Sequence, residues 1–207
     1  MKAHLFLRRR KVRDEIYRAL MFEKERNAVG LIHMLDSDLR GASKQFIVRG
    51  HAATLLGRLG DPRAIPYLME LRHDPEETVR VDVMTALGKL KAREAESVLI
   101  EALSESSWVV RGSAARALGR LGSAGAIPAL WNVVDSDPDR WVRLDAIEAL
   151  VILGDETARG RVPEALRAIS WRARGDRWKR LRYAAESGEA LSPYAFAWER
   201  RYERRAG

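Results

Sequence analysis

Apolar residues in the stretch "PEETVRVDVMTALGKL" (residues 75–90) fall at helical spacing. Val79, Val83, Leu87 and Leu90 recur at i, i+4, i+8 and i+11, so they share one face of a helix. Arg80, Asp82, Thr85 and Lys89 stand at positions between them. No segment of the chain alternates apolar and polar residues with period two, so we expect no β-strands.

A second kind of segment with an apolar helix face lies next to such stretches along the chain. In "DPRAIPYLMEL" (residues 61–71), Ile65, Leu68 and Leu71 lie on one face. Asp61 and Pro62 are suited to the N-cap and the first helical position. We therefore expect the chain to be built from pairs of short amphipathic helices.

The pair of segments recurs along the chain, and each copy is marked by one arginine that directly follows a valine. These anchors are Arg13, Arg49, Arg80, Arg111 and Arg143, spaced by 36, 31, 31 and 32 residues. A leucine stands seven residues after every anchor: Leu20, Leu56, Leu87, Leu118 and Leu150. An aliphatic residue stands nineteen residues after the first four: Ile32, Leu68, Leu99 and Leu130. Repeats of this period indicate stacked helical units, because one pair of short helices cannot bury both apolar faces alone.

Helix ends are also marked in the sequence. Asp74-Pro75, followed by Glu77, and Asp137-Pro138 each have the order of an N-cap and first helical residue. Gly60 and Gly122 stand where a helix would end.

The segments "VRGHAATLLGRLGDPRAIPYL" and "VRGSAARALGRLGSAGAIPAL" resemble HEAT repeats, in the short form also found in phycobilisome-lyase proteins. The resemblance covers roughly residues 12–170. It implies an all-α, right-handed α-solenoid of about five helix pairs in which the Val-Arg helix lines the concave face. We expect residues 1–170 to form this array and residues 171–207, basic and aromatic, to form a C-terminal helical cap.

The resemblance assigns structural roles to the motif residues. The anchor arginine is expected to bridge neighbouring repeats, with Asp82 and Asp145 as candidate partners. Gly57, Gly88 and Gly119 stand inside predicted helices, where glycine costs about 1 kcal/mol relative to alanine. Close approach of neighbouring helices would explain that cost.

Composition narrows the function classes. The chain contains no cysteine, which excludes disulfides and thiol chemistry and favours a reducing, cytoplasmic setting. We see no signal peptide and no apolar stretch near the ~20 residues of a membrane span. The net charge of +8 is concentrated at the two ends, while the repeats between them are slightly acidic.

Two recurrent features of the repeats are candidates for a binding surface. Cations recur near the C-terminal ends of the Val-Arg helices: Arg58, Lys89 and Arg120, with Arg116 one turn earlier. Such a row could follow an acidic peptide or a phosphate backbone, or could complement the helix dipoles alone. Aromatic residues recur just before the anchors: Phe46, Trp108, Trp141 and, less securely placed, Trp171. They could form interface hot spots, or pack each helix start onto its neighbour.

No catalytic or metal-binding motif is present, and the four histidines are scattered. The sequence therefore predicts a non-enzymatic scaffold without a cofactor that binds a partner protein through its concave face and aromatic rim. Nucleic-acid binding, as in HEAT-like DNA-repair glycosylases, and an accessory or lyase role in cofactor attachment to another protein are the alternatives.

Overall fold

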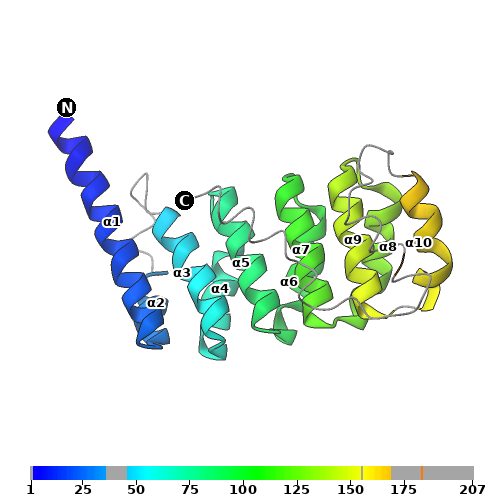
Figure 1. Ribbon diagram of the computed structural model, residues 1–207, viewed down its shortest axis with the longest axis horizontal. Coiled ribbons are helices and arrows are strands. Elements are labelled where there is room, and N and C mark those ends of the chain that lie inside the picture. The colour runs from blue at the N-terminus through cyan, green and yellow to red at the C-terminus, as the bar shows by residue number, and fades with distance from the viewer. Residues whose placement is uncertain (1, 36–45, 155, 169–182, 184–207) are drawn as a thin grey trace.

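The computed structural model describes residues 2–35, 46–154, 156–168 and 183, and all the regular structure within these residues is helical. Residues 171–207, which we expected to form the cap, lie outside this part of the chain except for Tyr183. The helices alternate between two rows that run the length of the molecule (Figure 1). The prediction of an all-α solenoid is confirmed.

The first row contains the Val-Arg helices, which stand side by side (Figure 1). They are α1 (Lys2–Lys24), α3 (Phe46–Leu59), α5 (Glu77–Lys89), α7 (Trp108–Leu121) and α9 (Arg140–Leu153). The N-terminal part of α1 projects beyond the ends of the other helices (Figure 1).

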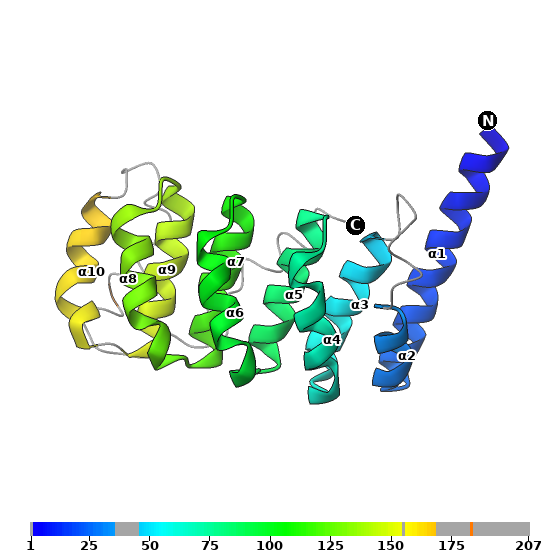
Figure 2. The same ribbon diagram turned by 180° about the vertical axis from the view of Figure 1, so that it is seen from behind.

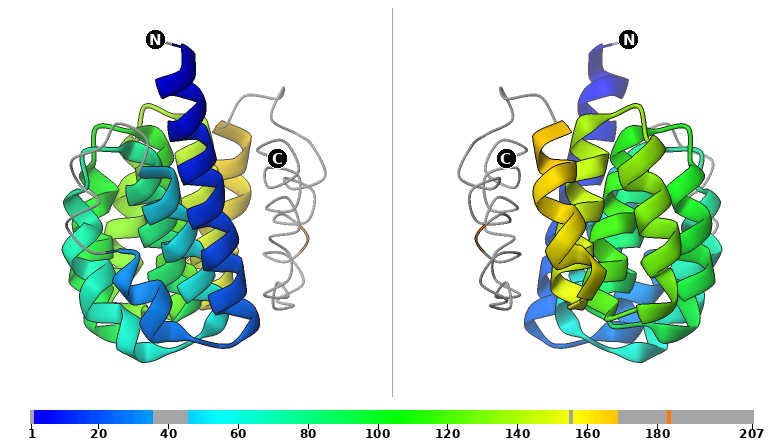
Figure 3. Two further views of the ribbon diagram at one scale, coloured as in Figure 1. Left: turned by 90° about the vertical axis from the view of Figure 1, so that its left-hand side faces the viewer. Right: turned by 90° about the vertical axis from the view of Figure 1, so that its right-hand side faces the viewer.

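The second row lies behind the first and is seen from the front in Figure 2. Its helices are α2 (Ala28–His33), α4 (Ile65–Glu70), α6 (Glu96–Glu101), α8 (Ile127–Ser136) and α10 (Glu156–Ala168). Short 3-10 turns extend three of them: η2 (Pro62–Ala64) and η3 (Leu71–His73) around α4, η4 (Arg93–Ala95) and η5 (Ala102–Ser104) around α6, and η6 (Ala124–Ala126) before α8. Viewed end-on, successive units lie behind one another (Figure 3).

Glycine and alanine bring the Val-Arg helices into close contact. A Cβ placed on Gly57 would lie 2.8 Å from the Cα of Ala86, and one on Gly88 would lie 2.8 Å from the Cα of Ala117. Gly119 repeats this arrangement. The predicted close approach is confirmed at three successive contacts: α3–α5, α5–α7 and α7–α9.

The two rows differ in how their helices meet. Each Val-Arg helix from α3 to α9 packs extensively on the next, whereas α4, α6 and α8 pack on the Val-Arg row and hardly touch one another. The spacing is therefore tight in the first row and open in the second. A stack with one tight and one open row curves toward the tight row, as solenoid units rotated by a small angle do.

The anchor valines and leucines form the centre of a continuous core. Val79, Leu87 and Leu99 are fully buried, and so are their counterparts in the neighbouring repeats. The first unit departs from this pattern: Leu20 is 42% exposed, and the Arg13 side chain is 76% exposed. These two positions are exposed because α1 is the first of the described helices and packs on a Val-Arg helix, α3, on one side alone.

The Asp-Pro pairs open turns instead of helices. The helix after Asp74 begins at Glu77, and the helix after Asp137 begins at Arg140, with Asp139 as its N-cap. The carboxylates of Asp74 and Asp137 accept hydrogen bonds from the backbone N–H groups of Glu76 and Asp139. The expected N-caps at Asp74 and Asp137 were therefore wrong.

These carboxylates are instead the partners of the anchor arginines. Arg49 pairs with Asp74 at 2.8 Å, and Arg111 with Asp137 at 2.7 Å. Arg80 reaches Glu105 at 3.5 Å. The arginines do bridge neighbouring repeats, as expected, but their partners lie in the loop that begins the next repeat and are not Asp82 and Asp145.

Glycine in the left-handed conformation ends three of the Val-Arg helices, as predicted for Gly60 and Gly122 and found also at Gly154. Non-glycine residues take this conformation after the other two, Arg26 after α1 with φ of 53° and Lys91 after α5 with φ of 51°. A side chain in this conformation is strained, because its Cβ approaches the following carbonyl oxygen.

Candidate functional site

Two tryptophans are exposed at the same end of neighbouring Val-Arg helices. Trp108 is the first residue of α7, after the N-cap Ser107, and is 47% exposed. Trp141 is the second residue of α9, after the N-cap Asp139, and is 41% exposed. We call Trp108 and Trp141 the Trp pair. Because α7 and α9 pack side by side and in parallel, both indoles lie at one rim of the array.

The other predicted aromatic positions differ from the Trp pair. Phe46, the first residue of α3, is half-buried and packs against the core. Trp171 lies outside the described residues. The guanidinium of Arg140 lies 5.2 Å from the centre of the Trp141 ring, which leaves that indole exposed with a cation at its face. Trp131 on α8 is buried beneath the guanidinium of Arg161.

The predicted cations lie on successive Val-Arg helices, but they do not form a continuous row of uncompensated positive charge. Arg58 of α3 pairs with Glu23 of α1 at 3.1 Å. Arg116 of α7 pairs with Asp145 of α9 at 2.5 Å and donates to Ser113. Lys89 and Arg120 are each the cation in the last turn of their helix and are half-buried. Arg58 and Arg116 are thus each paired with a carboxylate of the neighbouring repeat.

Asp82 lies in the contact between α3 and α5, which we call the α3–α5 seam. Its carboxylate lies directly against Gly50, so that a Cβ on Gly50 would come within 2.5 Å of Oδ2. The hydroxyl of Thr54 donates to Oδ1 at 3.2 Å. Burial raises the pKa of the Asp82 carboxyl to about 6, against the opposing effects of the Thr54 hydrogen bond and the Lys89 charge.

The α7–α9 seam repeats this geometry with a different partner. Asp145 lies against Gly112 as Asp82 lies against Gly50. The position of Thr54 is taken by Arg116, which forms the ion pair with Asp145. Equivalent carboxylates therefore meet an arginine at one seam and a threonine hydroxyl at the other.

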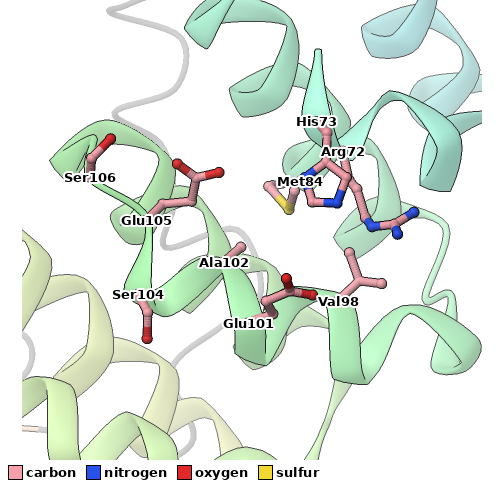
Figure 4. Close-up of a pocket in the computed structure, with 9 residues that line it drawn as sticks. All are labelled: Arg72, His73, Met84, Val98, Glu101, Ala102, Ser104, Glu105 and Ser106. Atoms are coloured by element: carbon pink, nitrogen blue, oxygen red, sulfur yellow. The ribbon is translucent and has the colours of Figure 1, made fainter. Parts of the chain in front are cut away.

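A cavity of about 350 Å³ opens between the second-row helices of the second and third repeats. Met84, Val98 and Ala102 form its apolar part (Figure 4). Arg72 and His73 come from η3 on one side; Glu101, Ser104, Glu105 and Ser106 come from α6, η5 and the loop that follows. The cavity lies where the second row is open.

Comparison with known proteins decides the family. A family description of HEAT repeats matches residues 33–103, 69–151 and 96–188. The chain belongs to the HEAT-repeat family.

Among solved structures, this HEAT array is similar to a crystal structure of an engineered protein from the Northeast Structural Genomics Consortium. The TM-score is 0.54 at 18% sequence identity, over 87% of this chain and 90% of the engineered one. At this identity the likeness concerns the fold alone. A search of curated proteins gives no significant match.

HEAT repeats generally mediate protein–protein interaction. No group of three or more histidine, cysteine or acidic side chains suited to a metal lies within the described part of the HEAT array. None of the helices described is long and apolar enough to span a bilayer.

Two features of the HEAT array were not identified from the sequence. The cavity could have been found by aligning the repeats. Twenty-two residues after the anchor, the second and fourth repeats have Leu71 and Val133, whereas the third has Ala102, whose smaller side chain leaves space. The Asp82 environment could have been found from Gly50 and Thr54, one and five residues after the anchor Arg49, where α7 has Gly112 and Arg116.

Proposed function

We propose that this chain is a non-enzymatic scaffold that binds a partner protein through its Val-Arg face and the rim that carries the Trp pair. The observation that carries the proposal is the exposure of Trp108 and Trp141 at 47% and 41%. Tryptophan is enriched at interface hot spots, where a large apolar surface is desolvated on binding. Two such residues at one rim supply a surface larger than a lone exposed side chain does.

The charges of the Val-Arg face favour a protein partner over a nucleic acid. Arg58 and Arg116 are paired with Glu23 and Asp145. A phosphate backbone requires cations that can exchange their counterions for phosphates, and an arginine held by a carboxylate of its own chain contributes less to this exchange.

The test is retention of binding partners on the immobilised full chain. The variant Trp108→Ala/Trp141→Ala removes the Trp pair, and Tyr67→Ala is the matched control. Tyr67 is an aromatic residue on α4 in the second row and is 47% exposed. We expect a protein retained by the wild type and by Tyr67→Ala to bind the double variant at least about tenfold more weakly, a loss of about 1.4 kcal/mol.

The folded state is checked by circular dichroism, which should be unchanged in both variants. Equal retention by the double variant and the wild type would refute a role for the Trp pair. Retention that is lost on nuclease treatment, with a steep dependence on salt concentration, would refute the protein partner in favour of nucleic acid.

A further inference from the structure

The α3–α5 seam contains a carboxylate that meets a neutral hydroxyl, whereas the equivalent carboxylate of the α7–α9 seam meets an arginine. Two residues after the anchor stand His51 on α3, Asp82 on α5, Ser113 on α7 and Asp145 on α9. The two aspartates lie against a glycine of the preceding Val-Arg helix. Asp145 is paired with Arg116, Ser113 is not ionisable, and His51 is a second titratable group whose pKa is lowered by burial and by the Arg58 charge. Asp82 accepts a hydrogen bond from the neutral hydroxyl of Thr54.

The surroundings of Asp82 offer little compensation for a negative charge. On α3, Arg49 is paired with Asp74 and Arg58 with Glu23. On α5, Arg80 reaches Glu105, and Lys89 acts on Asp82 by its charge without an ion pair. The remaining ionisable side chains on α5 and on the elements that pack against it are Glu77 of α5, His51 of α3, Tyr67 and Glu70 of α4, Arg72 and His73 of η3, and Arg111, Arg116 and Arg120 of α7.

The backbone of α3 also prevents Asp82 from moving away easily. The contact with Gly50 holds one carboxylate oxygen against the helix backbone, while the Thr54 hydroxyl holds the other. Both carboxylate oxygens are therefore engaged by α3.

We propose that the α3–α5 seam is a protonation-controlled joint of the array, tight when the Asp82 carboxyl carries a proton and loosened when it is ionised. The joint separates the first two units from the remainder, so that acidification stiffens the connection between them. This inference is independent of the nature of the partner.

The sign follows from the linkage between proton binding and stability. The pKa of Asp82 rises in the folded state from 3.8 to about 6. The folded seam therefore prefers the neutral carboxyl. Its contribution is fully present below pH 3.8 and is lost as the pH rises through about 6.

The test is amide hydrogen exchange read by mass spectrometry at about pH 5 and about pH 7.5, on either side of the titration, after correction for the intrinsic exchange rate. Peptides from α3 and α5 should lose protection at the higher pH. Between these two pH values the limit is about tenfold, because roughly half of the free energy linked to the two acid dissociation constants is already lost at pH 5. Peptides from α7 and α9 in the same samples serve as the internal control.

Two variants separate the joint from general effects of pH. Asp82→Asn keeps the shape and removes the ionisation, and should abolish the pH dependence in α3 and α5. Thr54→Arg reproduces the arrangement of Arg116 with Asp145, and should preserve protection at the higher pH. Unchanged protection in the wild type between the two pH values, or the same pH dependence in Asp82→Asn, would overturn the proposal.

Should either variant fail to fold, the wild type alone decides. The carboxyl carbon of Asp82, followed by nuclear magnetic resonance, should titrate near pH 6. A midpoint near the unperturbed value of about 4 would overturn the proposal on its own.

Discussion

At Gly88 a single hydrogen atom replaces the side chain that would otherwise separate α5 from α7. Glycine inside a helix costs about 1 kcal/mol relative to alanine, so the close contact must contribute more than that to be retained. The same argument applies to Gly57 and Gly119, whose ideal Cβ atoms would also lie within 3 Å of an alanine Cα.

We expect Gly88→Ala to lower the free energy of unfolding by about 1–2 kcal/mol, because the added methyl group forces α5 and α7 apart. The control is Gly160→Ala in α10, where a Cβ would meet nothing within 4 Å. That variant should gain up to about 1 kcal/mol from helix propensity. Urea unfolding followed by circular dichroism measures the free energy of unfolding of both variants. A Gly88→Ala variant as stable as the wild type would contradict the close-contact explanation.

Lys91 is the second position at which one residue determines local strain. Its φ of 51° is the conformation that Gly60, Gly122 and Gly154 adopt at the ends of the equivalent helices. We expect Lys91→Gly to raise the free energy of unfolding by about 1 kcal/mol, because glycine adopts this conformation without the Cβ clash. Thermal and urea unfolding test this; a loss of stability would show that the Lys91 side chain makes a favourable contact of greater value.

At the scale of helices and loops, the anchor arginines connect each repeat to the next. Arg49 and Asp74 have side chains only 3% and 1% exposed, and Asp74 also accepts from the backbone N–H of Glu76. Removal of one member of a buried ion pair leaves the other charge without compensation.

We therefore expect Arg49→Met to lower the free energy of unfolding by about 3–5 kcal/mol. The control, Arg63→Met, removes the arginine of an ion pair with Asp61 that lies at the surface, and should leave the unfolding midpoint unchanged. A small effect of Arg49→Met in urea unfolding would contradict a stabilising role for this bridge.

The sequence predicted the helix pairs but not every boundary or partner within them. Val79 and Leu87 revealed the repeat because burial imposes the same apolar residue in every unit. Asp74 was misassigned because an aspartate before proline suits both an N-cap and a turn, and only the position of Arg49 across the repeat boundary distinguishes the two. The partner of an anchor arginine depends on how far each unit is offset along its neighbour, which the chain order alone does not determine.

The candidate site shows the same limit. The sequence placed Trp108 and Trp141 at the starts of neighbouring helices, but exposure depends on what the adjoining loops leave uncovered. Phe46 holds the equivalent place in α3 and packs inward. Likewise, the charge of Arg116 was readable from the sequence, whereas its neutralisation by Asp145 required the structure.

At the scale of the whole molecule, each unit contacts chiefly its neighbours, so stability should depend on the register of the repeat. Deletion of residues 77–107 removes 31 residues, one period, and would place Gly57 opposite Ala117, the residue that Gly88 meets now. We expect the shortened chain to remain helical and to unfold cooperatively.

The control deletes residues 80–107, which removes 28 residues and shifts the register by three. It should lose helical content and aggregate, because apolar residues of α7 would turn away from the core. Circular dichroism and size-exclusion chromatography distinguish the outcomes; equal behaviour of the two deletions would contradict a register-dependent stack.

The sparse contact among α4, α6 and α8 has a mechanical consequence. The packing among the Val-Arg helices should supply most of the resistance to bending. The distances between second-row helices can then increase or decrease with little loss of contact. We expect small rotations between successive Val-Arg helices to add up along the array. They would change its overall curvature while the glycine contacts between these helices are kept. A solenoid whose curvature changes in this way could fit partners of different size.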